Sequence, residues 1–102
     1  MSSSGLKASA VTIVDVVVGT DALTAELSDG RTVAVPIAWY PRLLHGTPKE
    51  RKRWRLIGSG TGVHWPDLDE DISLESLLAG RPSLESPRSL KRWLQERVSA
   101  NG

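Results

Sequence analysis

The chain of 102 residues contains no cysteine. A disulfide framework, a thiolate metal site and a cysteine nucleophile are therefore excluded. Long apolar runs are missing too, because the patch at 11–19 is interrupted by Asp15 and is far shorter than the roughly 20 residues that a membrane span needs. The first residues carry one lysine and no apolar segment, so they do not resemble a secretory signal. These absences predict a cytoplasmic protein with no membrane partner.

What is present fits one small soluble domain, with 39% hydrophobic and 25% charged residues. The net charge is only +1, but the charges lie in blocks. Residues 41–56 hold six basic groups and one acidic group, whereas residues 57–80 hold five acidic groups and no lysine or arginine. A surface with such blocks can steer partners of either sign.

The first third of the chain has the pattern of strands. A β-branched run at 11–19 predicts a buried strand, and residues 22–28 and 31–36 alternate apolar and polar side chains. Asp29-Gly30 separates the two alternating segments, and this dipeptide between such segments is a strong hairpin signal. The pattern predicts a three-stranded antiparallel β-meander over about 11–36.

Helix signals follow. Residues 39–46 resemble a short helical turn, and Thr47-Pro48 with Glu50 form a capping box that predicts a helix over about 48–53. Ser73 and Gly80 bracket a second helix, over about 73–79, and Pro87 starts a third, over about 87–99. Further short strands are expected near 54–65.

Together these elements predict an α+β fold, in which the meander and the further short strands pack on the short helices, with a C-terminal helix in addition. The domain organisation that follows is a disordered N-terminal segment at 1–9, an α+β domain at 10–80, and a linker with the C-terminal helix at 81–102.

Three pieces of the chain carry a family resemblance: LTAELSDGRTVAVPI, WYPRLLHGTPKERKRWRLIG and GTGVHWPDLDEDISLESLLAG. In this order they resemble the domain-of-unknown-function family 2442, a group of small bacterial proteins, over about 12–80. The resemblance implies an α+β fold and no established enzyme activity. It also implies a place in a toxin–antitoxin pair, with a small toxin-like protein of domain-of-unknown-function family 4160 as the partner.

The stretch GVHWPDLDEDIS at 62–73 concentrates the carboxylates. Asp67, Asp69 and Asp71, with His64, are a candidate metal or catalytic site. A calcium loop is excluded because its required glycine is Ile72 and its final glutamate is Leu78 in this chain. The favoured interpretation is structural: Asp71 or Ser73 would cap the free N–H groups of the following helix, and the nearby carboxylates would favour its positive end. A partner-binding surface made of Asp67, Asp69 and Glu70 is the second interpretation.

The basic block offers a different candidate. Arg42, Arg51, Arg53 and Arg55 could contact phosphates, with Trp54 and Tyr40 stacking on bases. A solvated helix face with buried tryptophans explains the same residues, and the isoelectric point of about 8.2 is low for a dedicated nucleic-acid binder.

The C-terminal helix carries an apolar stripe of Leu90, Trp93, Leu94 and Val98. A helix of this length is marginal by itself in water, so something must cover the stripe. The sequence predicts that the helix docks on a partner or on a second copy of the chain, with Trp93 as the buried anchor and Leu90, Leu94 and Arg97 beside it.

The leading functional hypothesis is therefore a non-enzymatic protein-interaction module, antitoxin-like by resemblance, with no cofactor and no metal. The alternative is a DNA- or RNA-binding regulator that uses the basic block at 42–55. A metal-dependent hydrolase built on Asp67, Asp69 and Asp71 is a distant third.

Overall fold

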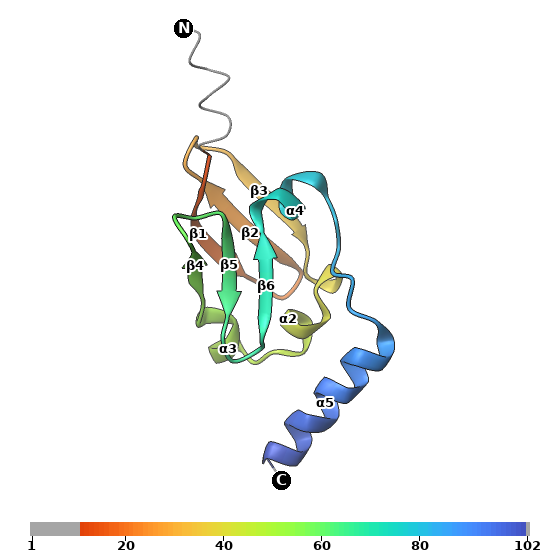
Figure 1. Ribbon diagram of the computed structural model, residues 1–102. Helices are drawn as coiled ribbons and strands as arrows, with labels where there is room; N and C mark the ends of the chain where they lie inside the picture. The colour runs from red at the N-terminus through yellow and green to blue at the C-terminus, as the bar shows by residue number, and fades with distance from the viewer. Residues whose placement is uncertain (1–10, 102) are drawn as a thin grey trace, which may run out of the picture.

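A computed structural model of the protein describes residues 11–101, and their side chains up to residue 98. The predicted disorder of 1–9 lies outside these residues. Three antiparallel strands open the fold in the order β1-β2-β3, namely Ile13–Val18, Ala22–Leu27 and Thr32–Pro36 (Figure 1). The predicted meander is confirmed.

The turn between β2 and β3 follows from its sequence. Gly30 has a φ of 94°, a conformation that residues with a Cβ rarely adopt, and its N–H donates to the carbonyl of Leu27 at 3.0 Å. The Asp29 side chain accepts hydrogen bonds from both the backbone N–H and the guanidinium of Arg31. This local closure fixes the register in which Ala25 pairs with Val33, so the buried residues of both strands share one face.

A helical segment connects this sheet to the rest of the fold. It consists of the short 3-10 helix η1 (Ile37–Trp39) and two α-helices, α2 (Pro41–His45) and α3 (Pro48–Lys52). The capping box at the start of α3 is present as predicted: the Glu50 N–H donates to Thr47 Oγ1 at 3.1 Å, and the Thr47 N–H donates to Glu50 Oε1 at 2.9 Å.

A second antiparallel sheet has the order β4-β5-β6, with strands Arg55–Ile57, Gly62–Trp65 and Glu70–Ser73. The short strands expected near 54–65 are confirmed as β4 and β5. The third strand, β6, was not foreseen, because its carboxylates were interpreted as a helix-capping segment.

That interpretation of Asp71 is wrong. The residue lies in β6 opposite His64, and its side chain hydrogen-bonds the His64 ring instead of capping a helix. Ser73 does cap helix α4 (Leu74–Ala79), since its hydroxyl accepts the N–H of Ser76 at 3.1 Å. Asp71 lies in a strand because the segment alternates: buried Ile72 lies between exposed Asp71 and Ser73, and this two-residue period is typical of a half-buried strand.

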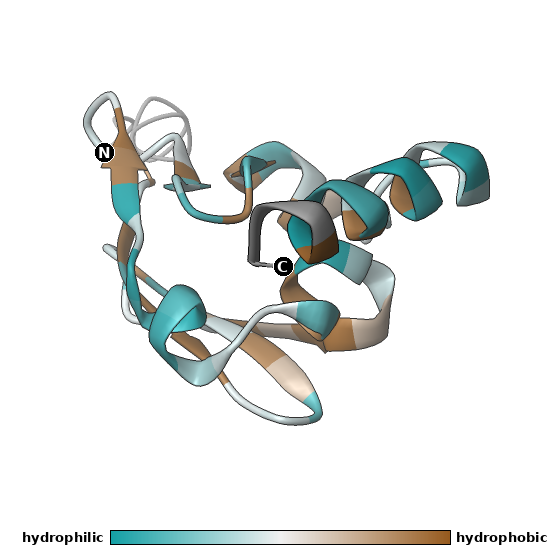
Figure 2. Ribbon diagram, turned by 90° about the horizontal axis from the view of Figure 1, so that it is seen from below, coloured by the Kyte–Doolittle hydropathy of each residue, from teal (hydrophilic) through white to brown (hydrophobic). Residues whose placement is uncertain are grey.

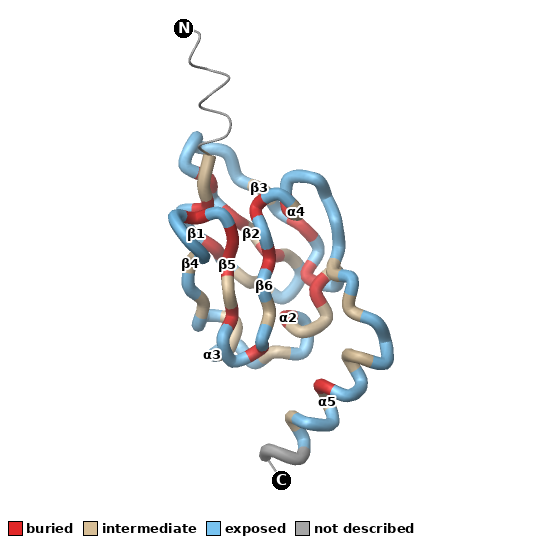
Figure 3. Tube along the Cα trace, viewed as in Figure 1, coloured by how far each residue is buried: buried red, intermediate tan, exposed pale blue. Residues whose placement is uncertain are grey.

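The two sheets and the helical segment share one hydrophobic core (Figure 3). Trp65 and Leu68 are fully buried, and Trp39 and Trp54 pack against the core from its margin. The other core side chains come from both sheets and from helices α2 and α4, among them Ile13, Leu23, Leu27, Val35, Leu43, Val63, Ile72 and Leu77. The predicted α+β class is confirmed.

The C-terminal helix α5 (Pro87–Asn101) contacts the helical segment of its own chain through the side chains of Arg42 and Glu50. Its hydrophobic residues gather on one side, and its surface is exposed along most of its length except at one buried position (Figures 2 and 3). That position is Trp93, which is 9% exposed. Among residues 11–101, no helix has the length and apolar character to cross a membrane.

Trp93 has contacts within its own chain, and its docking on another molecule stays a prediction. The guanidinium groups of Arg42 and Arg97 lie over its ring, at 5.1 and 4.7 Å from the ring centroid. Arg97 also forms a double hydrogen bond with Glu50 of α3, at 2.8 and 3.0 Å. The sequence pattern could not reveal Arg42 and Glu50 as partners, because each lies more than forty positions from the residue of α5 that it contacts.

Candidate functional site

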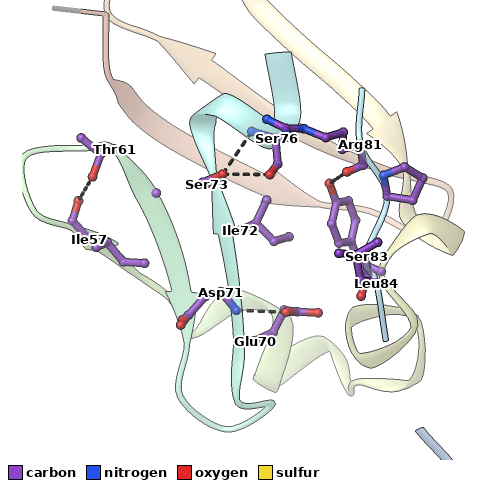
Figure 4. Close-up of a pocket in the computed structure, with 13 residues that line it drawn as sticks. Ile57, Thr61, Glu70, Asp71, Ile72, Ser73, Ser76, Arg81, Ser83 and Leu84 are labelled. Carbon is purple, nitrogen blue, oxygen red and sulfur yellow. Dashed lines mark hydrogen bonds between the residues drawn. The ribbon is translucent and has the colours of Figure 1, made fainter. Parts of the chain in front are cut away.

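A hollow of about 490 Å³ lies between strand β6 and the segment 81–84 that follows α4 (Figure 4). In the close-up, Glu70 and Ile72 point from β6 toward that segment, whereas Asp71 points to the other side of the strand. We call this hollow the β6 groove, and it is lined most prominently by Tyr40, Glu70, Ile72, Ser73, Arg81 and Leu84.

One wall of the groove is the outer edge of β6, the last strand in the order β4-β5-β6. The Leu74 N–H donates to the carbonyl of Thr61 on the β5 side, at 2.9 Å. The N–H and C=O groups of successive residues point to opposite edges of a strand. The backbone groups of Ile72 and Glu70 therefore also point toward β5, and those of Asp71 and Ser73 point toward the groove. The Asp71 N–H is met there by Glu70 Oε1 at 3.0 Å.

The opposite wall is held in place by two hydrogen bonds. Tyr40 Oη donates to the Arg81 carbonyl at 3.2 Å, and the Ser83 N–H donates to the Trp39 carbonyl at 3.0 Å. Leu84 follows directly and is 99% exposed. A fixed backbone thus presents a bare leucine side chain at the border of the groove, with exposed Ile57 of β4 also lining the hollow.

Glu70 is the unusual titratable group of the groove. Burial raises its pKa to about 7, and the nearby charges of Glu85 and Asp71 act in the same direction, against the Asp71 N–H and the Arg42 guanidinium. The pKa of Tyr40 is also raised, first by burial and then by the charge of Glu70. The floor of the groove therefore holds a carboxyl group that changes charge near neutral pH.

The other carboxylates of the acidic stretch diverge. Asp67 pairs with Arg53 at 3.3 Å, Asp69 pairs with Arg42 at 3.6 Å, and Asp71 pairs with His64. Asp69 itself has a φ of 50° in the turn between β5 and β6. In the part of the chain that the structure describes, no group of three or more His, Cys, Asp or Glu side chains is placed to hold a metal ion.

Two arginines of the basic block, Arg42 and Arg51, are engaged within the chain. Arg42 forms a double hydrogen bond with Glu85 at 2.7 and 2.8 Å, and its own pKa is raised while that of Glu85 is lowered by this contact. Arg51 donates to the carbonyls of Leu43 and Leu44. Four arginines were expected to contact nucleic acid in the alternative hypothesis. Of these, Arg53 and Arg55 are exposed to solvent, and Arg53 forms an ion pair with Asp67.

The residues considered for partner binding divide in the same way. Trp93 and Arg97 contact residues of their own chain. Leu90 and Leu94 are half-buried against the core. Asp67 and Asp69 lie in the turn before β6. Among these residues, only Glu70 lines the β6 groove. The sequence did not identify Ile57, Ser73 and Leu84 as residues of a binding site, although they line the same groove. The alternation from Glu70 to Ser73 was the signal that could have revealed the edge strand.

Comparisons with known proteins place this fold in a family. The family model described as "Protein of unknown function (DUF2442)" matches residues 13–83. A crystal structure of a protein of unknown function from Rhodospirillum rubrum is 25% identical, with 74% of this chain and 93% of that chain covered and a TM-score of 0.63. The solution NMR structure of an uncharacterized protein from Chromobacterium violaceum is 24% identical and has the same fold, with coverages of 91% and 82% and a TM-score of 0.64. No curated protein matches the chain.

Proposed function

The chain belongs to the family of proteins of unknown function DUF2442, and from this membership we propose that it is a cytoplasmic, non-enzymatic protein-interaction module that binds a small partner protein in the β6 groove. Its partner is toxin-like by the family resemblance, and the chain then acts as the antitoxin-like member of the pair.

The observation that carries the proposal is the exposed leucine at an open strand edge. Leu84 is 99% exposed although the backbone on either side of it is held by hydrogen bonds. The outward-facing backbone of Asp71 and Ser73 lies across the groove from it. An apolar side chain beside an open strand edge is a favourable arrangement for a protein partner, because on binding the leucine leaves water and the strand groups gain hydrogen bonds from the partner.

The arrangement of charged groups supports binding over catalysis. Asp67, Asp69 and Asp71 each face a different basic partner, so their carboxylates do not converge on one reacting atom. Glu70 is the carboxyl group turned into the groove, and its neighbours there are Tyr40, Ile72 and the Asp71 backbone. A half-buried carboxyl group at an open groove can pair with a basic side chain of a partner.

Site-specific photo-crosslinking in the native host tests the proposal. A benzophenone amino acid placed at position 84 is expected to crosslink to one small protein, which mass spectrometry identifies. The matched control carries the same amino acid at position 34, where exposed Ala34 lies on the first sheet. We expect no equivalent product from the control.

Two results would contradict the proposal. One is an identical set of crosslinks from positions 84 and 34, which would mean random collision. The other is crosslinking of position 84 to RNA or DNA, which would favour a nucleic-acid-binding regulator. A third assay addresses catalysis: turnover of a nuclease or phosphatase substrate that is abolished by Asp69→Ala would show that the chain is an enzyme.

A further inference from the structure

We propose that the partner enters the β6 groove as an extended segment, adds a strand to the free edge of β6, and carries basic side chains alternating with apolar ones. This inference rests on the proposed function and specifies how the partner is recognised.

The backbone of β6 is suited to strand addition. The Ser73 N–H and the Asp71 carbonyl face away from β5, and Ser73 has the extended dihedral angles of φ −86° and ψ 150°. The Asp71 N–H is covered by the side chain of its own neighbour, Glu70, at 3.0 Å, and that flexible side chain can move aside. An extended segment that pairs with these groups continues the ladder of the sheet, a recurring mode of peptide recognition.

The two faces of β6 set the alternation of the segment. Side chains of an added strand that lie beside Ile72 point into the groove, where Tyr40 and Leu84 form apolar surroundings. The volume of about 490 Å³ is within the range of about 300–1,000 Å³ in which proteins enclose small ligands. Apolar side chains are therefore expected at these positions of the segment.

The acidic residues near β6 predict which side chains of the partner segment alternate with its apolar ones. Side chains beside Asp71 point to the opposite face of the strand, where a cross-strand pair of opposite charge is favourable. Residues 57–80 hold five acidic groups and no lysine or arginine. Arg81 also lines the groove, and its guanidinium pairs with Glu75 at 3.4 Å. Glu70 adds negative charge on the groove side once it ionises, near pH 7. A basic segment matches this edge.

A second copy of the chain fits the same edge poorly. Two β6 strands paired edge to edge would bring Glu70 and Asp71 of one copy next to the acidic residues of the other, and like charges opposite each other destabilise a sheet. The occupant is therefore a partner protein, and self-association through this edge becomes an outcome of the test.

The experiment selects a phage-displayed library of fully randomised seven-residue peptides on the immobilised full-length chain. We expect the enriched peptides to alternate lysine or arginine with valine, isoleucine or leucine. A synthetic peptide with the enriched sequence is then added to the full-length chain, and the exchange of the Ser73 amide with solvent is followed by NMR. The peptide is expected to protect this amide.

A matched pair of variants isolates the backbone contact. Ser73→Ala and Ser73→Pro both remove the hydroxyl that caps α4, but only proline removes the outward-facing N–H. The extended conformation at this position tolerates proline. Ser73→Pro is expected to bind the peptide about tenfold more weakly than Ser73→Ala, the effect of one lost backbone hydrogen bond. Leu84→Gln, at a fully exposed position, removes the apolar contact without adding charge and should also weaken binding.

The inference is overturned if the enriched peptides lack basic residues, if the Ser73 amide stays unprotected, or if Ser73→Pro binds as tightly as Ser73→Ala. Sedimentation that shows a dimer dissociated by Ser73→Pro would instead assign the edge to a second copy. If position 84 crosslinks to a small protein while the peptide results are negative, the proposed function stands and the mode of recognition is wrong.

Discussion

At the scale of single residues, Glu70 combines an exposed strand edge with a buried carboxyl group. Its pKa in the folded chain, about 7, is above the ordinary value of 4.5, because burial disfavours the charged form. Between these two pH values the unfolded chain has released this proton while the folded chain retains it. The contribution of Glu70 to stability is thus lost as the pH rises through 7.

Glu70→Gln should therefore stabilise the protein at high pH. The amide is uncharged at every pH and can still accept the hydrogen bond of the Asp71 N–H. We expect a gain of about 1–2 kcal/mol at pH 8, after discounting for partial solvent exposure, and almost none at pH 4.5. Thermal melts at both pH values measure it. Asp69→Asn, at an exposed side chain, is the control, and an equal gain from both variants would contradict the assignment.

Glu50 has the opposite behaviour. Its pKa is lowered to about 2, chiefly by the hydrogen bonds from Arg97, with the Thr47 N–H also contributing. Because the folded pKa lies below the unfolded value, its stabilising contribution is complete above about pH 4.5 and is lost as the pH falls toward 2. Glu50 is the contact through which α3 holds the far end of α5.

Acidification should therefore loosen α5. Between pH 6 and pH 2.5 we expect the NMR signal of the Trp93 indole to move toward that of an exposed tryptophan, since protonated Glu50 pairs weakly with Arg97. Glu50→Gln keeps a side chain that suits the capping box and should remove most of this pH dependence. An unchanged titration in that variant would show that another group controls the helix.

At the scale of elements, α4 depends on its cap. Ser73→Ala leaves the Ser76 N–H without its partner and is expected to lower the free energy of unfolding by about 1 kcal/mol. Chemical denaturation measures the loss. Because the hydroxyl takes no part in the strand edge, affinity for the partner should stay the same. A collapse of affinity at unchanged stability would mean that the hydroxyl itself contacts the partner.

The docking of α5 depends on one aromatic ring. Trp93→Ala removes the surface on which the guanidinium groups of Arg42 and Arg97 stack, so the helix should detach while both sheets persist. Hydrogen exchange is expected to speed up across residues 87–98 and to stay slow in β2 and β5. Val98→Ala, at an exposed position of the same helix, is the control. Equal acceleration in both variants would contradict the role of Trp93.

At the scale of the whole molecule, α5 is an addition to a core that is otherwise complete. All buried hydrophobic side chains of residues 11–98 apart from Trp93 lie between Ile13 and Leu77. The match to the family likewise ends at residue 83. Arg42 links the two parts, because it stacks on Trp93 and pairs with Glu85.

Removal of residues 86–102 should leave a folded protein of lower stability. We expect the circular dichroism of the two sheets to persist and the melting temperature to fall, because the Arg42 side chain loses its contact with Trp93 and Glu50 loses its pair with Arg97. A chain shortened only after residue 98 retains Trp93 and Arg97 and serves as the control. Complete unfolding of the shorter chain would show that α5 is part of the core.

The sequence by itself determined the local elements. Asp29-Gly30 and the alternation around it specified the meander, and Thr47, Pro48 and Glu50 specified the start of α3, because turns and caps are made by residues close together in the chain. Ser73 and Gly80 bounded α4 for the same reason. The family, too, was readable from short stretches of sequence.

Only the tertiary structure decided what the charged and aromatic residues do. Glu70 to Ser73 alternates like a strand, but four residues with two carboxylates do not specify one without a neighbour. The segment becomes β6 because it pairs with β5 and because Ile72 is buried in the core. The carboxylates that stand together in the sequence separate in space toward Arg53, Arg42 and His64. The covering of Trp93 and the groove beside Leu84 depend on contacts between residues far apart in the chain, which no local pattern encodes.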